Sequence, residues 1–99
     1  MAFYKKLGFL VFKRVERKQD VVVLLYGHGI NIEMFVDAGH PRPSIPEPLG
    51  LRHLALQVDD IVMTSKNLNL EIGPIMKDWL GEKFCFAVDP DGNKIELHE

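Results

Sequence analysis

Two stretches, one near the end of each half of the chain, share a single pattern. Residues 31–34 (NIEM) and 94–97 (KIEL) both read polar, isoleucine, glutamate, apolar. Strand-like runs precede each stretch, and a helix-like run and one more strand precede the second set. A pattern that recurs in this way is typical of a structural module used twice. The sequence therefore predicts two β-α-β-β-β modules, of which the first lacks its first strand.

A proline-rich segment separates the two modules. Residues 37–50 (DAGHPRPSIPEPLG) hold four of the six prolines of the chain, and proline is excluded from helix interiors and central strands. We therefore expect a first module over residues 1–36, a stiff linker over residues 37–50 and a second module over residues 51–99. With 99 residues, 46% hydrophobic and 26% charged, the chain suits one compact domain.

The run GLRHLALQVDD, residues 50–60, predicts a strand over residues 50–58 that is central to the second module. Its alternation places Leu54, Leu56 and Val58 on one face, which suits the core. His53 is thereby turned to the opposite face, either toward water or into a polar cavity.

The remaining elements follow from alternation, capping residues and turn residues. Strands are predicted over residues 9–16, 21–26, 30–36, 75–80, 84–88 and 94–98, and helical turns over residues 1–8 and 61–72. Asp59 or Asp60 is a candidate N-cap, and Gly73-Pro74 a candidate helix end. Residues 89–92 (DPDG) suit a type I turn between the last two strands. The expected fold class is α+β, with the two modules forming a cupped, partly open sheet and the helices outside.

Glu33, His53 and Glu96 are expected on the polar faces of three different strands. Two carboxylates and one imidazole are donors that suit Zn, Ni, Mn, Fe or Co. Taken singly, each residue has an ordinary interpretation, an exposed strand carboxylate or a half-buried histidine. Their convergence on one side favours a metal site.

Three further residues allow two interpretations each. His98 lies two residues from Glu96 on the same strand face, so it is either an additional ligand or an exposed terminal histidine. Trp79 is either a packing or rim residue or a platform on which a substrate stacks. Cys85, the single cysteine, is either a buried strand thiol or a reactive one, and we expect the buried thiol because no charged residue adjoins it.

Composition excludes several classes of partner. The formal net charge is −2 and the basic residues are scattered, so there is no electrostatic footprint for nucleic acid or an anionic membrane. The longest apolar run, residues 21–26, is far shorter than the ~20 residues of a membrane-spanning helix. No signal-peptide pattern follows Met1, and the expected location is the cytoplasm.

Four motifs together resemble those of the vicinal oxygen chelate superfamily: LRHLALQVDDI, DPDGNKIELHE, FYKKLGF and NIEMF. This superfamily includes glyoxalase I, fosfomycin- and bleomycin-resistance proteins, epimerases and extradiol dioxygenases. The resemblance covers essentially the whole chain, and the proline-rich segment is similar to that of a glyoxalase-like bacterial branch. It implies that Glu33, His53 and Glu96 match three of the four metal ligands of glyoxalase I. The fourth, a His or Gln on the first strand, would precede Met1.

The resemblance also implies a function. A divalent metal, with Zn or Ni first and Mn, Fe or Co as alternatives, would support a lactoylglutathione lyase-like lyase or isomerase. Such an enzyme acts on a small oxygenated substrate through an enediolate-type intermediate, and Glu96 would be the proton-shuttling base. The alternatives are a non-catalytic small-molecule-binding protein of the bleomycin-resistance type and a truncated, inactive relative. An unpaired sheet edge in the first module predicts a homodimer.

Overall fold

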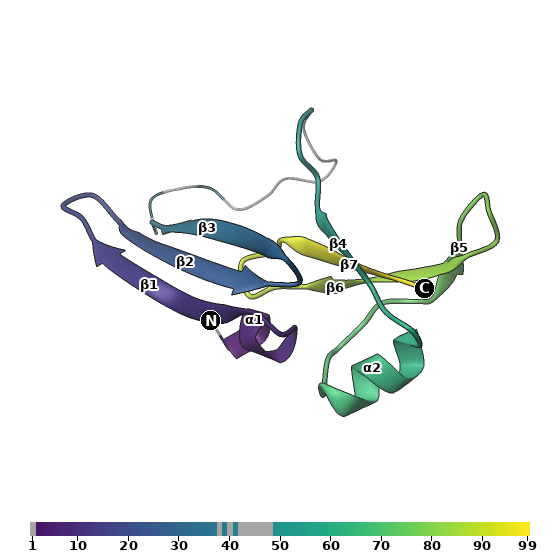
Figure 1. Cartoon of the computed structure of the whole chain (residues 1–99). Helices are drawn as coiled ribbons and strands as arrows, with labels where there is room; N and C mark the ends of the chain where they lie inside the picture. The colour runs from purple at the N-terminus through teal and green to yellow at the C-terminus, as the bar shows by residue number, and fades with distance from the viewer. Residues whose placement is uncertain (1, 38, 40, 42–48) are drawn as a thin grey trace. The chain divides into compact units, whose positions relative to one another are not determined.

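The computed structural model describes residues 2–37, 39, 41 and 49–99 (Figure 1). The chain divides into two compact units, Met1–Pro41 and Arg42–Glu99. The first contains α1 (Ala2–Lys6), β1 (Leu10–Glu16), β2 (Val21–Gly27) and β3 (Ile30–Val36). The second contains β4 (Leu54–Gln57), α2 (Ile61–Asn67), β5 (Met76–Lys77), β6 (Lys83–Val88) and β7 (Lys94–His98). The predicted α+β class with open sheets is confirmed, whereas most of the predicted linker lies outside the described residues and the single-domain boundaries stay a prediction.

The first unit holds an antiparallel sheet in the order β1-β2-β3. Its β2–β3 turn has two residues, His28 and Gly29, with φ of 52° and 76°, the left-handed pair that a tight hairpin requires. The His28 ring is fixed, because its Nε2 donates a hydrogen bond of 2.5 Å to the carbonyl oxygen of Leu7. A bulge between Val11 and Lys13 interrupts the register of β1 with β2.

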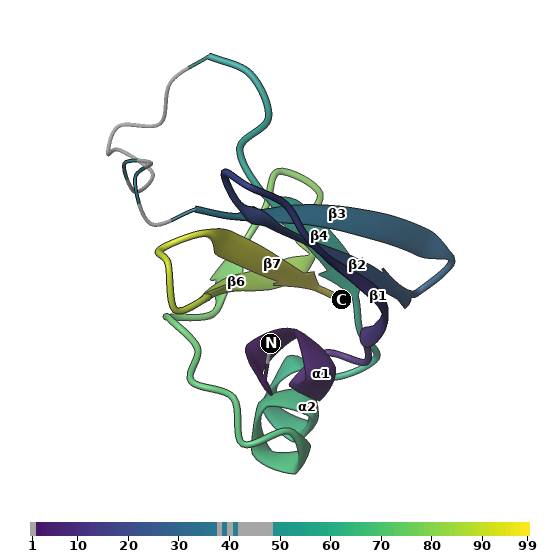
Figure 2. The same ribbon diagram turned by 90° about the vertical axis from the view of Figure 1, so that its left-hand side faces the viewer.

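The second unit holds a four-stranded sheet in the order β4-β7-β6-β5. β4 runs parallel to β7, and the other pairs are antiparallel. The parallel pair needs a crossover, which contains α2, and α2 lies on one side of this sheet in both views (Figure 1 and Figure 2). The order β4, α2, β5, β6, β7 is the complete module that the repeat predicts.

Side chains alternate between two faces along β7 and along residues 84–87 of β6. Those on one face are buried: Cys85, Ala87, Ile95 and Leu97. Those on the opposite face are half-buried: Phe84, Phe86, Lys94, Glu96 and His98. The sheet therefore has an apolar core face and a second face that mixes aromatic and charged groups, as the alternation predicts.

α2 begins as predicted but ends early. The side chain of Asp60 caps it by accepting the N–H of Met63 at 2.9 Å. Asn67 is its last residue, and the expectation of a helix up to Gly73-Pro74 is wrong. The reason lies at Asn69, which adopts a φ of 50° and so breaks the helical path before the apolar pattern stops.

Two strands are shorter than predicted. β4 starts at Leu54, where its ladder to β7 begins with Ile95, so that His53 precedes the strand. β5 has two residues, because the backbone turns at Asp78, whose N–H bonds to the carbonyl oxygen of Glu82 at 2.9 Å. No helix in the described part of the chain is long and apolar enough to cross a membrane.

Candidate functional site

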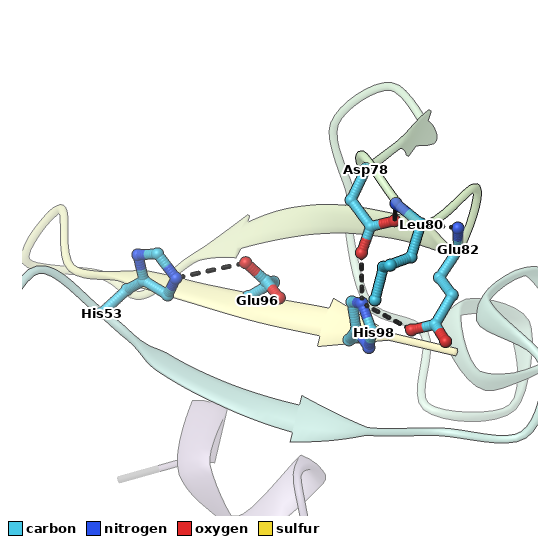
Figure 3. A network of polar contacts seen from close by, with 6 residues as sticks. All are labelled: His53, Asp78, Leu80, Glu82, Glu96 and His98. Atoms are coloured by element: carbon cyan, nitrogen blue, oxygen red, sulfur yellow. Dashed lines mark hydrogen bonds and ion pairs between the residues drawn. The ribbon is translucent and has the colours of Figure 1, made fainter.

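The second face of the β4–β7 sheet carries two of the three predicted site residues. Glu96 lies on β7, opposite Ala55 of β4 and Phe86 of β6. His53 comes directly before β4, and its Nε2 lies 3.2 Å from Oε1 of Glu96 (Figure 3). The two side chains are 27% and 18% exposed, so the pair is partly shielded from solvent. The sheet pairing thus brings together an imidazole and a carboxylate that are 43 residues apart in the sequence.

Aromatic rings flank this pair. The edge of the His53 ring meets the Phe86 ring at 5.1 Å between centroids, with an interplanar angle of 81°. Phe84 stands against Phe86 at 5.9 Å and 85°. Nζ of Lys94 lies 5.4 Å from the centroid of the Phe86 ring, within the range of a cation–π contact. The face therefore offers an apolar wall beside a polar pair and one positive charge.

A second polar group lies further along the same face of β7. Nε2 of His98 lies 3.1 Å from Oδ2 of Asp78 and 3.4 Å from Oε2 of Glu82 (Figure 3). Ligand atoms of these three residues all lie within 4.8 Å of one another. Oδ1 of Asp78 accepts the backbone N–H groups of Leu80 and Glu82 at 2.8 and 2.9 Å. This turn fixes the carboxylate and directs its other oxygen at His98.

The contact between His98 and Asp78 shifts the pKa of both side chains. The hydrogen bond from His98 holds the pKa of Asp78 below its ordinary value, and the N–H of Glu82 adds to the effect. The same hydrogen bond raises the pKa of His98 above its ordinary value, against a smaller opposing effect of burial. Mutual stabilisation of a carboxylate and an imidazolium is the common cause.

Glu33, the third predicted site residue, belongs to the first unit. It lies on β3 opposite Leu24 of β2 and is exposed. Its negative charge contributes to the raised pKa of Arg17, whose main cause is the hydrogen bond to Asp20. Arg17 also lies over the ring of Phe35, two residues from Glu33 on the same strand, at 5.4 Å. The local surroundings of Glu33 are thus a cation and an aromatic ring.

Sequence reasoning missed Asp78 and Glu82. The register aligns Met76, Phe84 and His98 across three strands. Asp78 is two residues beyond Met76, and Glu82 is two residues before Phe84, so that both share the face of His98. The even spacing of Asp78 from Met76 and of Glu82 from Phe84 was the available signal. Using it required knowledge of how the two-residue strand β5 pairs with β6.

The other uncertain residues have clear positions. His98 is not an exposed terminal histidine, since 27% of its side chain is exposed and it contacts two carboxylates. Trp79 is 92% exposed, which excludes the packing interpretation. Cys85 is fully buried as predicted, and this burial raises the pKa of its thiol, which makes it unreactive.

Comparison with known proteins gives a consistent result. The family model for the Glyoxalase/Bleomycin resistance protein/Dioxygenase superfamily matches residues 1–97. A Bacillus subtilis protein, YwkD, is 39% identical over an alignment 107 residues long. The alignment covers 99% of this chain and 84% of YwkD. The Escherichia coli protein YaeR is 44% identical over 73 residues, spanning 69% of this chain and 57% of YaeR.

A solved structure shares the fold. The crystal structure of the glyoxalase family protein from Enterococcus faecalis superposes with a TM-score of 0.87 at 40% sequence identity. The match covers 99% of this chain and 84% of the Enterococcus chain.

Proposed function

The chain belongs to the Glyoxalase/Bleomycin resistance protein/Dioxygenase superfamily, and we propose that it is a divalent-metal-dependent lyase or isomerase acting on a small oxygenated substrate. One observation carries the proposal. His53 and Glu96, predicted from the sequence as metal ligands, lie 3.2 Å apart on the mixed polar and aromatic face of the second unit.

The residues present fit a metal of the expected kind. Members of the superfamily typically bind a divalent metal. A neutral imidazole and a carboxylate are donors for Zn or Ni, and also for Mn, Fe or Co. His53 and Glu96 would hold the ion, and the resemblance adds Glu33 as a third ligand. When bound, the metal would act as a Lewis acid toward two neighbouring oxygens of the substrate.

Glu96 is the residue we assign to proton transfer. Oε1 of Glu96 faces the His53 ring, so Oε2 is the atom we assign to take a proton from one substrate carbon and return it to the next. The β-ladders on both sides of Glu96 fix its backbone. The rings of Phe84 and Phe86 line the face beside it and reduce the access of water. Together these contacts support positioned, partly desolvated base chemistry.

A binding protein without catalysis is the second candidate. The specific observation in its favour is the apolar wall, in which His53, Phe84 and Phe86 meet edge to face. Aromatic rings supply contact area for a flat or apolar ligand without any proton transfer. Superfamily members bind small molecules, so that both candidates use the same face.

Metal analysis of the purified protein tests the first candidate. We expect about one divalent ion per chain, removable by EDTA, at the site of His53 and Glu96, and expect His53→Asn and Glu96→Gln to lose it. Asp91→Asn, which removes an exposed carboxylate from the β6–β7 turn, is the matched control and should keep the ion. Tight binding of a small molecule by protein that is metal-free and indifferent to EDTA would instead establish the second candidate.

We also propose that the chain forms a homodimer. Superfamily members commonly dimerise. Among the described residues of the first unit, β3 is paired with β2 on one edge only, and an unpaired edge favours association with another chain. Light scattering should give twice the mass of one chain at micromolar concentration, and a monomer would refute the proposal.

A further inference from the structure

The group formed by Asp78, Glu82 and His98 is separate from the pair proposed to hold the catalytic metal. Both groups lie on the same face of the second unit, and β7 contributes to each (Figure 3). Glu96 and His98 are two residues apart on this strand, which corresponds to about 6.6 Å along it. The three ligand atoms that lie within 4.8 Å of one another belong to Asp78, Glu82 and His98 and do not include Glu96, so the two groups present separate sets of donors along β7.

The distances within this group suit a metal ion. A tetrahedral ion with ligand bonds of about 2.1 Å keeps its ligand atoms ~3.4 Å apart. Nε2 of His98 lies 3.1 Å from Oδ2 of Asp78 and 3.4 Å from Oε2 of Glu82. All three ligand atoms lie within 4.8 Å, so that a small movement of Glu82 completes the geometry.

Two of the three donors are held in place. His98 is paired through its backbone to Phe84 on one side and Gln57 on the other. Asp78 is fixed by the two N–H groups that bond to its Oδ1, and its Oδ2 faces His98. Glu82, with 49% of its side chain exposed, is the adjustable donor. Such preorganisation lowers the cost of assembling a ligand set around an ion.

We propose that Asp78, Glu82 and His98 bind a second divalent transition-metal ion, with Zn²⁺ as the ion that best suits one imidazole and two carboxylates. The turn over residues 78–82 joins β5 to β6, and His98 ends β7. The ion would therefore tie this turn to the end of β7. The exposed Trp79 and Leu80 lie in the same turn, so that occupancy would fix their position beside the face proposed to bind substrate.

Equilibrium dialysis with Zn²⁺, followed by metal analysis, tests this proposal. The background is His53→Asn/Glu96→Gln, which removes the first site. We expect about one Zn²⁺ per chain to remain, and Asp78→Asn in this background to weaken its binding by at least ~100-fold. Asparagine keeps the Oδ1 that accepts the two backbone N–H groups, so the turn is preserved while the charged ligand is lost. Asp91→Asn is the matched control and should bind as the background does.

A comparison without the double substitution keeps the test decisive if that background does not fold. Asp78→Asn or His98→Asn alone should then lower the Zn²⁺ stoichiometry of the otherwise unchanged chain by one ion. Unchanged stoichiometry and affinity in Asp78→Asn would overturn the proposal and leave the group as an ion pair of His98 with two carboxylates. Failure of the proposed function has a different signature, since His53→Asn would then bind as much Zn²⁺ as the unsubstituted chain.

Discussion

Glu33 and Glu96 stand at the same position of the repeated pattern, but their surroundings differ. Glu96 lies on β7, which is paired on both edges, and its side chain, 18% exposed, faces His53. Glu33 lies on β3, which is paired on one edge only among the described residues of the first unit, and it is exposed. The repeated pattern thus decides which face a carboxylate occupies. The neighbouring strand decides which group stands beside it.

β4 makes the difference between the two units. Its parallel ladder to β7 begins at Leu54 and carries His53 to the position beside Glu96. Parallel pairing requires a crossover connection, which here contains α2. Among the described residues of the first unit, no strand pairs with β3 in the way that β4 pairs with β7, so this unit gives a comparison for the effect of that pairing.

The largest expected effect concerns metal affinity. Glu96→Gln should weaken divalent-metal binding at the His53 site by at least ~100-fold, since loss of even a supporting residue around a metal costs 10–100-fold. Glu33→Gln should cost less, about 10-fold, because an exposed carboxylate competes with water for the ion. Titration of each variant with Zn²⁺, monitored by calorimetry, measures both. Equal losses would show that the difference in surroundings has no bearing on ligation.

Much of this could be predicted from sequence, because the alternation of side chains is a local property. It correctly assigned β6 and β7, their core face, and the shared face of Glu96 and His98, although it made β4 and β5 too long. Asp60 as N-cap and the turn at residues 89–92 also follow from local chemistry. These elements depend on neighbours within a few residues, so they can be predicted from the local sequence.

What could not be predicted depends on strand register. The contact of Asp78 with His98 spans 20 residues and requires the pairing of two short strands. The end of α2 depended on Asn69 adopting a left-handed conformation, although the apolar pattern continued to Ile72. The proposed ligand role of Glu33 rests on the resemblance alone, because the local environment of an exposed carboxylate carries no signal for a metal.

The hairpin turns that precede Glu33 and Glu96 are stabilised in different ways. The β2–β3 turn relies on the backbone of His28 and Gly29, whereas in the β6–β7 turn buried Asp89 accepts the N–H groups of Asp91 and Asn93 at 3.0 and 2.8 Å. Asp89→Ala leaves these donors unsatisfied and should cost about 1–3 kcal/mol of unfolding free energy. Urea denaturation measures it. Asp91→Ala, at an exposed position of the same turn, is the control, and an equal loss there would contradict the assigned role.

The cap of α2 should have a smaller effect. Asp60 accepts the N–H of Met63, so Asp60→Ala is expected to lower the unfolding free energy by about 1 kcal/mol. Asp59→Ala is the matched control, because its carboxylate adjoins the cap without holding this position. A destabilisation that is the same for both substitutions would mean that the negative charge matters, and not the capping hydrogen bond.

The smallest expected effect is the pH dependence of the contact between His98 and Asp78. The raised pKa of His98 gives stability that is complete below its unfolded value of about 6.5 and is lost as pH rises through the folded value. The lowered pKa of Asp78 gives stability that is present above about 3.9 and is lost as pH falls through its folded value. Both contributions are therefore complete only between about pH 4 and 6.5.

Thermal unfolding of the wild type and His98→Asn, in the presence of EDTA to remove metal, measures this contribution. The difference in Tm should be largest near pH 5–6 and should shrink toward pH 9, as the imidazolium loses its proton. Added salt should reduce it further, because Glu82, one of the two carboxylates involved, is half exposed. A difference in Tm that stays constant from pH 5 to 9 would mean that His98 stabilises the sheet by packing.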